Sequence, residues 1–256
     1  MKQTRGLMST AIIALILLSI TLQFYSAEAW TNPYFGTTWN NPTSSLAQTM
    51  IMNNIMSKSL KNNLSQGRPA GNYPSSFQGE RREQRTPDYI FQATPRKIMP
   101  KVIADRMSDK ADRRREWENT FIQFIDSFEQ NARREHLPHN LVYAISFFIW
   151  ANYSVAKNGI SITDDQQRDL YRMIAPSFAN NADLKSMSDL QKQGLYETRV
   201  IEGMFALVGF NGARERNDID AQKKIRKFAM NNLKAAGISY QQIHLTRQGW
   251  SIKKAG

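Results

Sequence analysis

Acidic side chains are the residues of this 256-residue chain whose types and spacing most readily suggest chemistry. Two carboxyl groups can hydrolyse a glycosidic bond, because one protonates the leaving oxygen while the other activates water or attacks the sugar. Two predicted helices carry the candidates Glu116, Glu118, Asp126, Glu129, Glu197 and Glu202. Most of these positions lie opposite an aromatic stripe, where acidic residues are usually solvated. We therefore keep a small cell-wall hydrolase as the alternative interpretation and assign no catalytic residue.

Other catalytic and metal-binding patterns are weak in this sequence. The chain has no cysteine and three histidines. His136 and His139 flank Leu137-Pro138 and lack the four-residue spacing that places two metal ligands on one helix face, and His244 stands alone. There is no Gly-x-Ser-x-Gly elbow and no glycine-rich phosphate loop. We predict no metal site and no cofactor.

A cluster of aromatic and polar residues is a more promising candidate for a ligand site. Trp150, Asn152 and Tyr153 lie near the end of an apolar segment, and Tyr196 and Glu197 lie on a later helix that could face them. These five residues could line a groove that forms hydrogen bonds with a ligand. A polar network that satisfies itself inside the protein is the structural alternative.

Helical periodicity from residue 112 onward predicts the elements that must position these residues. Aromatic residues spaced along one face predict a helix over 112–136, and a nearly all-apolar run predicts a central buried helix over 141–156 that ends at Asn158-Gly159. Capping-box patterns at Thr163 and Ser188 predict the starts of two more helices, the second ending at Gly209 or Gly212. A fifth helix is expected from Asp218 to Gly237.

These patterns predict an all-α fold, a single bundle of about five helices over residues 113–256, with a C-terminal strap from about residue 238. The region 30–112 instead reads as a largely disordered, flexible basic arm, because it holds seven of the nine prolines and much Asn, Ser, Gln and Arg. Within this arm, near-helical spacing of Leu, Met and Ile predicts one amphipathic helix at 45–64. That helix could contact a membrane surface or a partner, or fold back onto the domain.

The first 29 residues match a signal peptide. Lys2 and Arg5 precede an apolar run from Leu7 to Phe24, and small residues at positions 27 and 29 suit cleavage before residue 30. We expect a periplasmic or secreted protein, with an anchor formed by an uncleaved N-terminal segment as the alternative.

The chain is basic, and removal of Lys2, Arg5 and Glu28 with the signal peptide would lower the net charge only from +12 to +11. Such a charge favours anionic partners through attraction that salt weakens. We expect an anionic envelope component or a protein as the partner. Nucleic acid is disfavoured because aromatic residues are not interleaved with the basic ones. Arginines at the two ends of the basic segment are the candidate anion-binding residues: Arg81, Arg82, Arg85, Arg113, Arg114 and Arg115.

Short motifs in residues 115–250 resemble a family of uncharacterised exported bacterial proteins. They are Leu137-Pro138 followed by Ala144, Ala151-Asn152-Tyr153 before Gly159, the helix start from Gln191 to Glu197, and Ala236-Gly237 followed by Leu245-Thr246 and Gly249. The resemblance implies an envelope or secreted location and an α-helical domain, but no activity. Together these observations predict an exported, non-enzymatic helical binding or assembly module.

Overall fold

The computed structural model describes residues 87–252, except residues 180, 242, 247 and 248. The expected signal peptide, the amphipathic helix at 45–64 and Arg81, Arg82 and Arg85 lie outside the described residues. Within the described part, the fold is mostly helical, with seven helices and one short two-stranded sheet. None of the helices there is long and apolar enough to span a membrane.

The sequence predicted that the domain begins after residue 112, but the structure shows that the preceding segment is also part of it. Residues 87–98 and helix α4 (Met99–Met107) pack on the domain, and Tyr89, Phe91 and Ile103 are buried. An isolated bridge pairs Ile90 with Asn140. The prolines of this segment suggested a flexible arm, but its apolar residues bury enough surface against α5 and α9 to order it.

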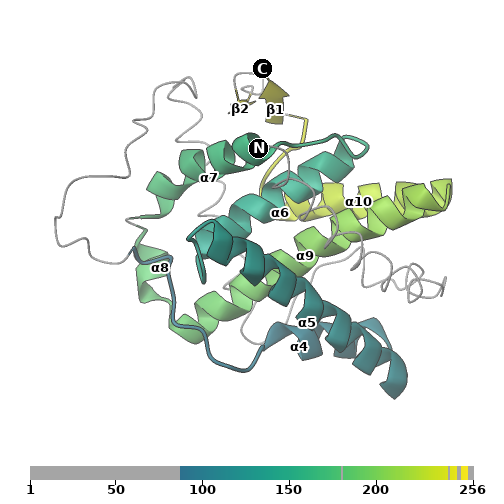
Figure 1. Ribbon diagram of the computed structural model, residues 1–256, viewed down its shortest axis with the longest axis horizontal. Helices are drawn as coiled ribbons and strands as arrows, with labels where there is room; N and C mark the ends of the chain where they lie inside the picture. Colours follow the sequence, from purple (N-terminus) through teal and green to yellow (C-terminus); the bar gives the residue numbers. More distant parts are fainter. Residues whose placement is uncertain (1–86, 180, 242, 247–248, 253–256) are drawn as a thin grey trace, which may run out of the picture.

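The two helices at the centre of the fold follow the sequence pattern closely. Helix α5 (Ala111–Arg134) buries one face, including Phe121, Phe124 and Phe128. Helix α6 (Leu141–Ala156) is buried at every position except Trp150, as expected for a helix that is apolar nearly all round. Figure 1 shows α6 in the middle of the molecule, with other helices on several sides.

Local capping signals set the starts of three of the remaining helices. Helix α7 (Asp164–Phe178) and helix α9 (Asp189–Glu215) both begin with the predicted capping boxes, at Thr163 and Ser188. Helix α10 (Ile219–Ala235) begins after Asp218, whose side chain accepts a hydrogen bond from the backbone N–H of Ala221. A five-residue helix, α8 (Ala182–Ser186), was not predicted and lies between α7 and α9.

Helix α9 is longer than predicted because Gly209 and Gly212 lie within it, rather than at its end. Both glycines are buried, so close packing keeps them helical despite their low helix propensity. The chain then turns at Asn217, which has a positive φ of 54°. Helix α10 packs on α6 and α9 and completes the bundle.

The tail packs back on the domain as a hairpin. Strand β1 (Ile243–Thr246) pairs antiparallel with strand β2 (Gly249–Ile252). Trp250 is buried, and its indole N–H donates a hydrogen bond of 2.7 Å to the carbonyl of Gln166 on α7. Strands of four residues are too short for an alternating pattern to reveal them, which is why the sequence predicted only a strap.

Candidate functional site

A cleft of about 620 Å³ runs along one face of α6 and is the candidate binding site. Its floor consists of Tyr143, Phe147, Trp150 and Ser154, which recur every three or four residues and therefore share a helix face. Tyr143 and Ser154 are eleven residues apart, so the floor is roughly 16 Å long at the α-helical rise. The walls come from α5, from α9, and from the loop between α6 and α7 with the first turn of α7. They contribute Ser127, Phe128, Gln130, Asn131, Arg134, Gly159, Ile160, Ser161, Ile162, Asp164, Gln167, Met204, Leu207, Val208, Phe210, Asn211 and Arg214, and Val155 of α6 completes the lining.

Two glycines let the elements around the cleft pack closely together. Gly203 lies against Phe147, and a Cβ at this position would be only 2.5 Å from the Phe147 ring. Gly159 has a φ of +75°, and a Cβ there would be 2.6 Å from the Phe210 ring. Both positions therefore require glycine for space, and Gly159 also for its backbone conformation.

At the end of the cleft near α5, three polar side chains are linked by hydrogen bonds. The Asn131 amide donates a hydrogen bond of 3.0 Å to the Tyr143 hydroxyl, and its oxygen accepts one of 3.2 Å from Arg134. Burial, followed by the nearby charges of Glu135 and Asp164, raises the pKa of Tyr143 to about 12. Tyr143, which lines the cleft, is therefore a neutral phenol near pH 7.

The opposite end of the cleft is shaped by the loop after α6. The Ser154 hydroxyl donates a hydrogen bond of 2.6 Å to the carbonyl of Ile160, and the Gln167 amide donates one of 3.3 Å to the carbonyl of Ile162. These bonds hold the loop against the floor. The exposed guanidinium of Arg214 lies at this end, close to Gly159.

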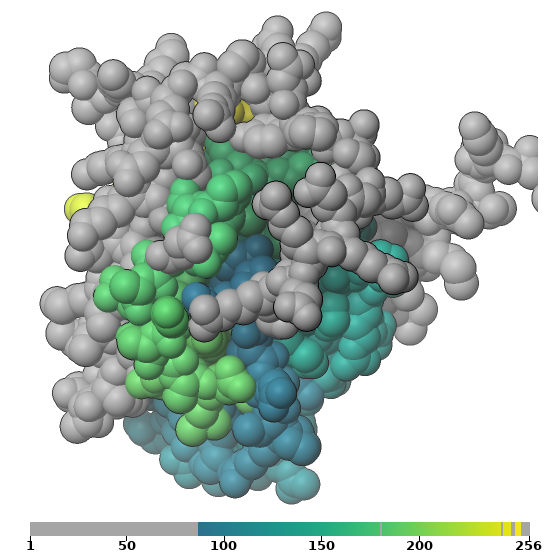
Figure 2. Space-filling view, turned by 90° about the vertical axis from the view of Figure 1, so that its left-hand side faces the viewer, coloured from purple at the N-terminus to yellow at the C-terminus, as the bar shows by residue number. Residues whose placement is uncertain are grey.

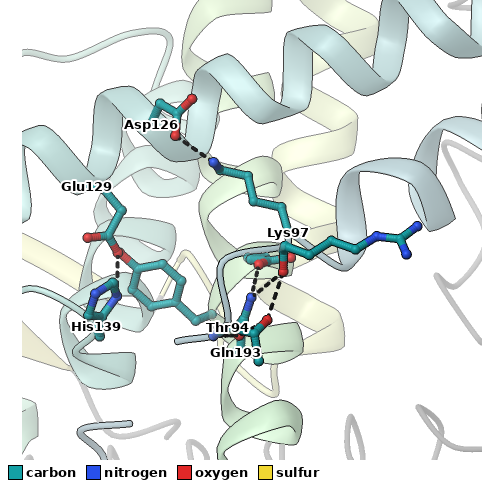
Figure 3. Close-up of polar contacts among 9 residues, drawn as sticks. Thr94, Lys97, Asp126, Glu129, His139 and Gln193 are labelled. Atoms are coloured by element: carbon teal, nitrogen blue, oxygen red, sulfur yellow. Dashed lines mark hydrogen bonds and ion pairs between the residues drawn. The ribbon is translucent and has the colours of Figure 1, made fainter. Parts of the chain in front are cut away.

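A polar cluster whose Glu129 and Tyr196 are buried lies beside the cleft, where α5 meets α9. The Tyr196 hydroxyl donates a hydrogen bond to Glu129 Oε1, and His139 Nδ1 lies 3.4 Å from the same oxygen. The Glu129–His139 contact is drawn in Figure 3. Burial and the Glu129 carboxylate raise the pKa of Tyr196 well above its usual value. The Phe91 ring packs against both His139 and Tyr196 and covers the cluster.

A second polar cluster fastens residues 94–99 to α9. Glu197 Oε2 accepts hydrogen bonds of 2.8 Å from the backbone N–H groups of Ile98 and Met99. The Gln193 side chain accepts from the backbone N–H of Thr94 at 2.8 Å, and it donates to Glu197 Oε1 at 2.8 Å. The segment is also held by a 2.7 Å ion pair between Lys97 and Asp126 of α5 (Figure 3). Figure 2 shows the blue surface of the first described residues. It lies between the green surface of α9 and the teal surface of the residues that follow the blue ones in the sequence.

The structure does not gather the five predicted groove residues into one groove. Trp150 lines the cleft, but Asn152 is fully buried and its oxygen accepts a hydrogen bond of 2.9 Å from Asn232 of α10. Tyr153 packs edge-on against Trp250 of the hairpin. The groove prediction is corrected in this respect, because adjacent residues on a helix point in different directions and these meet different neighbours.

Tyr196 and Glu197 belong to the two polar clusters described above and not to the cleft. Tyr196, Glu197 and Asn152 therefore take part in internal polar contacts, which is the structural alternative that the sequence left open.

Five of the six candidate carboxylates, namely Glu116, Asp126, Glu129, Glu197 and Glu202, contact a basic side chain, a hydroxyl or a backbone N–H group. Glu202 is buried and accepts a hydrogen bond of 2.8 Å from Arg199, whose guanidinium lies 4.5 Å from the centre of the Phe148 ring. Burial raises the pKa of Glu202, and Arg199 partly offsets that effect. Asp126 pairs with Lys97, and Glu116 pairs with Arg113 at 3.0 Å. None of these contacts brings two carboxyl groups together, so the geometry gives the hydrolase interpretation no support.

The arginines at the start of α5 lie among acidic residues. Arg113 pairs with Glu116, and Arg114 lies 3.8 Å from Asp105 of α4. Residues 99–118 hold six lysines and arginines against five aspartates and glutamates, a net charge of +1. This local balance weakens the prediction that Arg113, Arg114 and Arg115 form an anion-binding surface.

Sequence reasoning missed most of the cleft. Its wall residues Asn131, Arg134, Asn211 and Arg214 are single polar residues on amphipathic helices and resemble any solvated face. The spacing of Tyr143, Phe147, Trp150 and Ser154 on α6 was the available signal, because it combines aromatic rings with polar atoms on one face.

These features define a mostly helical domain that is built around one buried helix and has an open cleft along it. The chain belongs to the family of unknown function DUF6683, whose model matches residues 4–253. No curated protein and no solved structure matches the chain.

Proposed function

We propose that this protein is an exported, non-enzymatic helical binding module and that the α6 cleft is its ligand site. The observation that carries this proposal is the cleft itself. Its volume of about 620 Å³ falls within the range of roughly 300–1,000 Å³ that is usual for ligand pockets. Aromatic rings on its floor supply contact area, and polar groups on its walls supply orientation.

The lining favours a short extended peptide as the ligand. Carboxamides line the walls at Gln130, Asn131, Gln167 and Asn211, and each carboxamide combines a donor and an acceptor as the peptide group does. A floor of roughly 16 Å accommodates about five residues of extended chain at 3.3 Å each. Phe147, Trp150 and Met204 offer apolar surface for alternate side chains of such a peptide.

Export is supported by the pattern of the first 29 residues, with Lys2 and Arg5 before an apolar run and small residues before position 30. A periplasmic or secreted location follows from this proposal. Contact of the segment 45–64 and of Arg81, Arg82 and Arg85 with a membrane surface or an anionic partner stays a prediction from the sequence.

Obstruction of the cleft tests the proposed site. A library of displayed random heptapeptides is selected on residues 30–256, and the affinity of the enriched peptides is measured by fluorescence anisotropy. Ser127→Tyr places a ring in the cleft from α5 and should weaken binding at least tenfold. Gln123→Tyr adds the same ring to an exposed position of α5 outside the cleft and is the matched control. Selection without enrichment, or equal binding by both variants, would refute the cleft as a peptide site.

A further inference from the structure

The segment from the end of α9 through α10 carries most of the excess positive charge of the described domain. Residues 214–234 hold seven basic residues, namely Arg214, Arg216, Lys223, Lys224, Arg226, Lys227 and Lys234. They hold three acidic residues, Glu215, Asp218 and Asp220, so their net charge is +4. Residues 99–118, where the sequence suggested an anion-binding cluster, have a net charge of only +1.

The geometry of α10 places its lysines in one exposed stripe. Lys223, Lys227 and Lys234 are separated by four and seven residues, so they share a helix face, and all three are exposed. The opposite face of the helix, with Ile225, Phe228 and Leu233, is buried. Figure 1 shows α10 in yellow alongside α9. The three lysines span roughly 16 Å, and Asp220 lies 3.5 Å from Lys223 on this face.

Apolar residues lie on the same face as the lysines. Ile219 precedes Lys223 by four residues, and its side chain is 57% exposed. Met230 lies between Lys227 and Lys234 in the stripe and is half-buried. Lysines interspersed with exposed apolar side chains on one helix face are typical of helices that lie on a membrane surface.

We propose that the outer face of α10 docks on a bilayer surface that contains anionic lipids. Lysines on a convex helix diverge, so they cannot converge on one small anion, whereas a charged plane meets all of them at once. The aliphatic stems of the lysines and the Ile219 side chain can enter the boundary of the headgroups while the ammonium groups remain in water. This surface is separate from the peptide cleft, and the proposal goes beyond the function argued above.

Vesicle co-sedimentation tests this proposal with residues 30–256. The vesicles consist of phosphatidylcholine alone or with about a third phosphatidylglycerol, at low and at physiological salt. We expect binding only to the anionic vesicles and weaker binding at physiological salt. Each lysine near such a surface contributes about 1 kcal/mol, so Lys223→Gln, Lys227→Gln and Lys234→Gln together should weaken binding about a hundredfold.

A matched control separates the α10 face from net charge. Arg113→Gln, Arg114→Gln and Arg115→Gln together remove the same charge from the start of α5, and this variant should retain most of the binding. Both triple variants should keep the circular dichroism spectrum of the wild type, because all six side chains lie at least partly in solvent. Equal losses in the two variants, or no binding of the wild type to anionic vesicles, would overturn the proposal.

A final variant separates a bilayer from a soluble polyanion. Ile219→Ser keeps every charge, and it should weaken vesicle binding severalfold without changing the binding of inorganic polyphosphate. If Ile219→Ser binds vesicles as the wild type does, the partner of α10 is a soluble polyanion and the bilayer proposal is wrong.

Discussion

The contact between Glu197 and the start of α4 yields the sharpest prediction. Helix α4 has no capping side chain of its own, and Glu197 of α9 accepts hydrogen bonds from the backbone N–H groups of Ile98 and Met99. It also accepts one from the Gln193 amide. Glu197→Ala would remove the acceptor of these three hydrogen bonds at a position where Glu197 is only 2% exposed. At about 1 kcal/mol per hydrogen bond, the free energy of unfolding should fall by about 3 kcal/mol.

Glu197→Gln should cost much less than Glu197→Ala. Both backbone N–H groups donate to the same oxygen, Oε2, and a glutamine oxygen can replace it. The new amide group would face the Gln193 amide, so one hydrogen bond is lost, and the cost should be about 1 kcal/mol. Burial raises the pKa of Glu197 more than its hydrogen bonds with Met99, Gln193 and Ile98 lower it.

This pKa shift predicts the pH dependence of the difference between the wild type and Glu197→Gln. A raised pKa means that the folded state binds the proton more tightly than the unfolded state, so the wild type gains stability as the pH falls through the folded pKa. That contribution is fully present below the unfolded pKa and is lost as the pH rises through the folded pKa. The stability advantage of the wild type over Glu197→Gln should therefore be larger at pH 4 than at pH 7.

Urea unfolding of residues 30–256, followed by far-ultraviolet circular dichroism, measures these free energies. Amide hydrogen exchange reports whether residues 98–107 lose protection first in Glu197→Ala. Glu116→Ala is the control, because Glu116 is an exposed residue of α5 whose ion pair should be worth less than 1 kcal/mol. A Glu197→Ala variant within 0.5 kcal/mol of the wild type, or a glutamine variant as unstable as the alanine variant, would refute this reasoning.

Two further predictions concern the packing around α6. Asn232→Ala removes the donor to the buried Asn152 oxygen and should lower the free energy of unfolding by about 1–3 kcal/mol. In a double-mutant cycle, Asn152→Ala should cost less in that background than alone, and strict additivity would contradict a direct bond. Gly203→Ala should cost about 1–3 kcal/mol by urea unfolding, because its Cβ would clash with Phe147, whose ring is packed between Phe128 and Trp150. Gly194→Ala on the same helix is its control and should be neutral or stabilising, because a Cβ there meets only a Met99 sulfur at 3.8 Å.

Local sequence signals predicted the helices that carry the site. The capping boxes at Thr163 and Ser188 mark the starts of α7 and α9, because a hydroxyl and a carboxamide three residues apart satisfy N–H groups of the same turn. The apolar run of α6 predicted its burial, because such a helix can shed water on every side only at the centre of a domain. These features depend on neighbours a few residues apart.

Tertiary contacts determine the hydrogen-bond partners of the polar side chains that the sequence singled out. Glu197 satisfies backbone groups of residues 98 and 99, and Asn152 bonds Asn232 eighty positions later. The local sequence around Asn152 or Glu197 does not show whether its partner is another part of the protein or a bound ligand. Either partner would satisfy the same buried hydrogen-bonding groups.

The sequence by itself therefore determined the helical class, the main helix starts and the excess of positive charge. The tertiary structure decided where that charge is exposed and where the cleft lies. Acidic neighbours around Arg113 and Arg114 balance the arginines at the start of α5, whereas the lysines of α10 face outward with few acids beside them. The physical reason is that packing between distant segments determines which charged side chains stay exposed. The same packing determines which helix faces line a cleft.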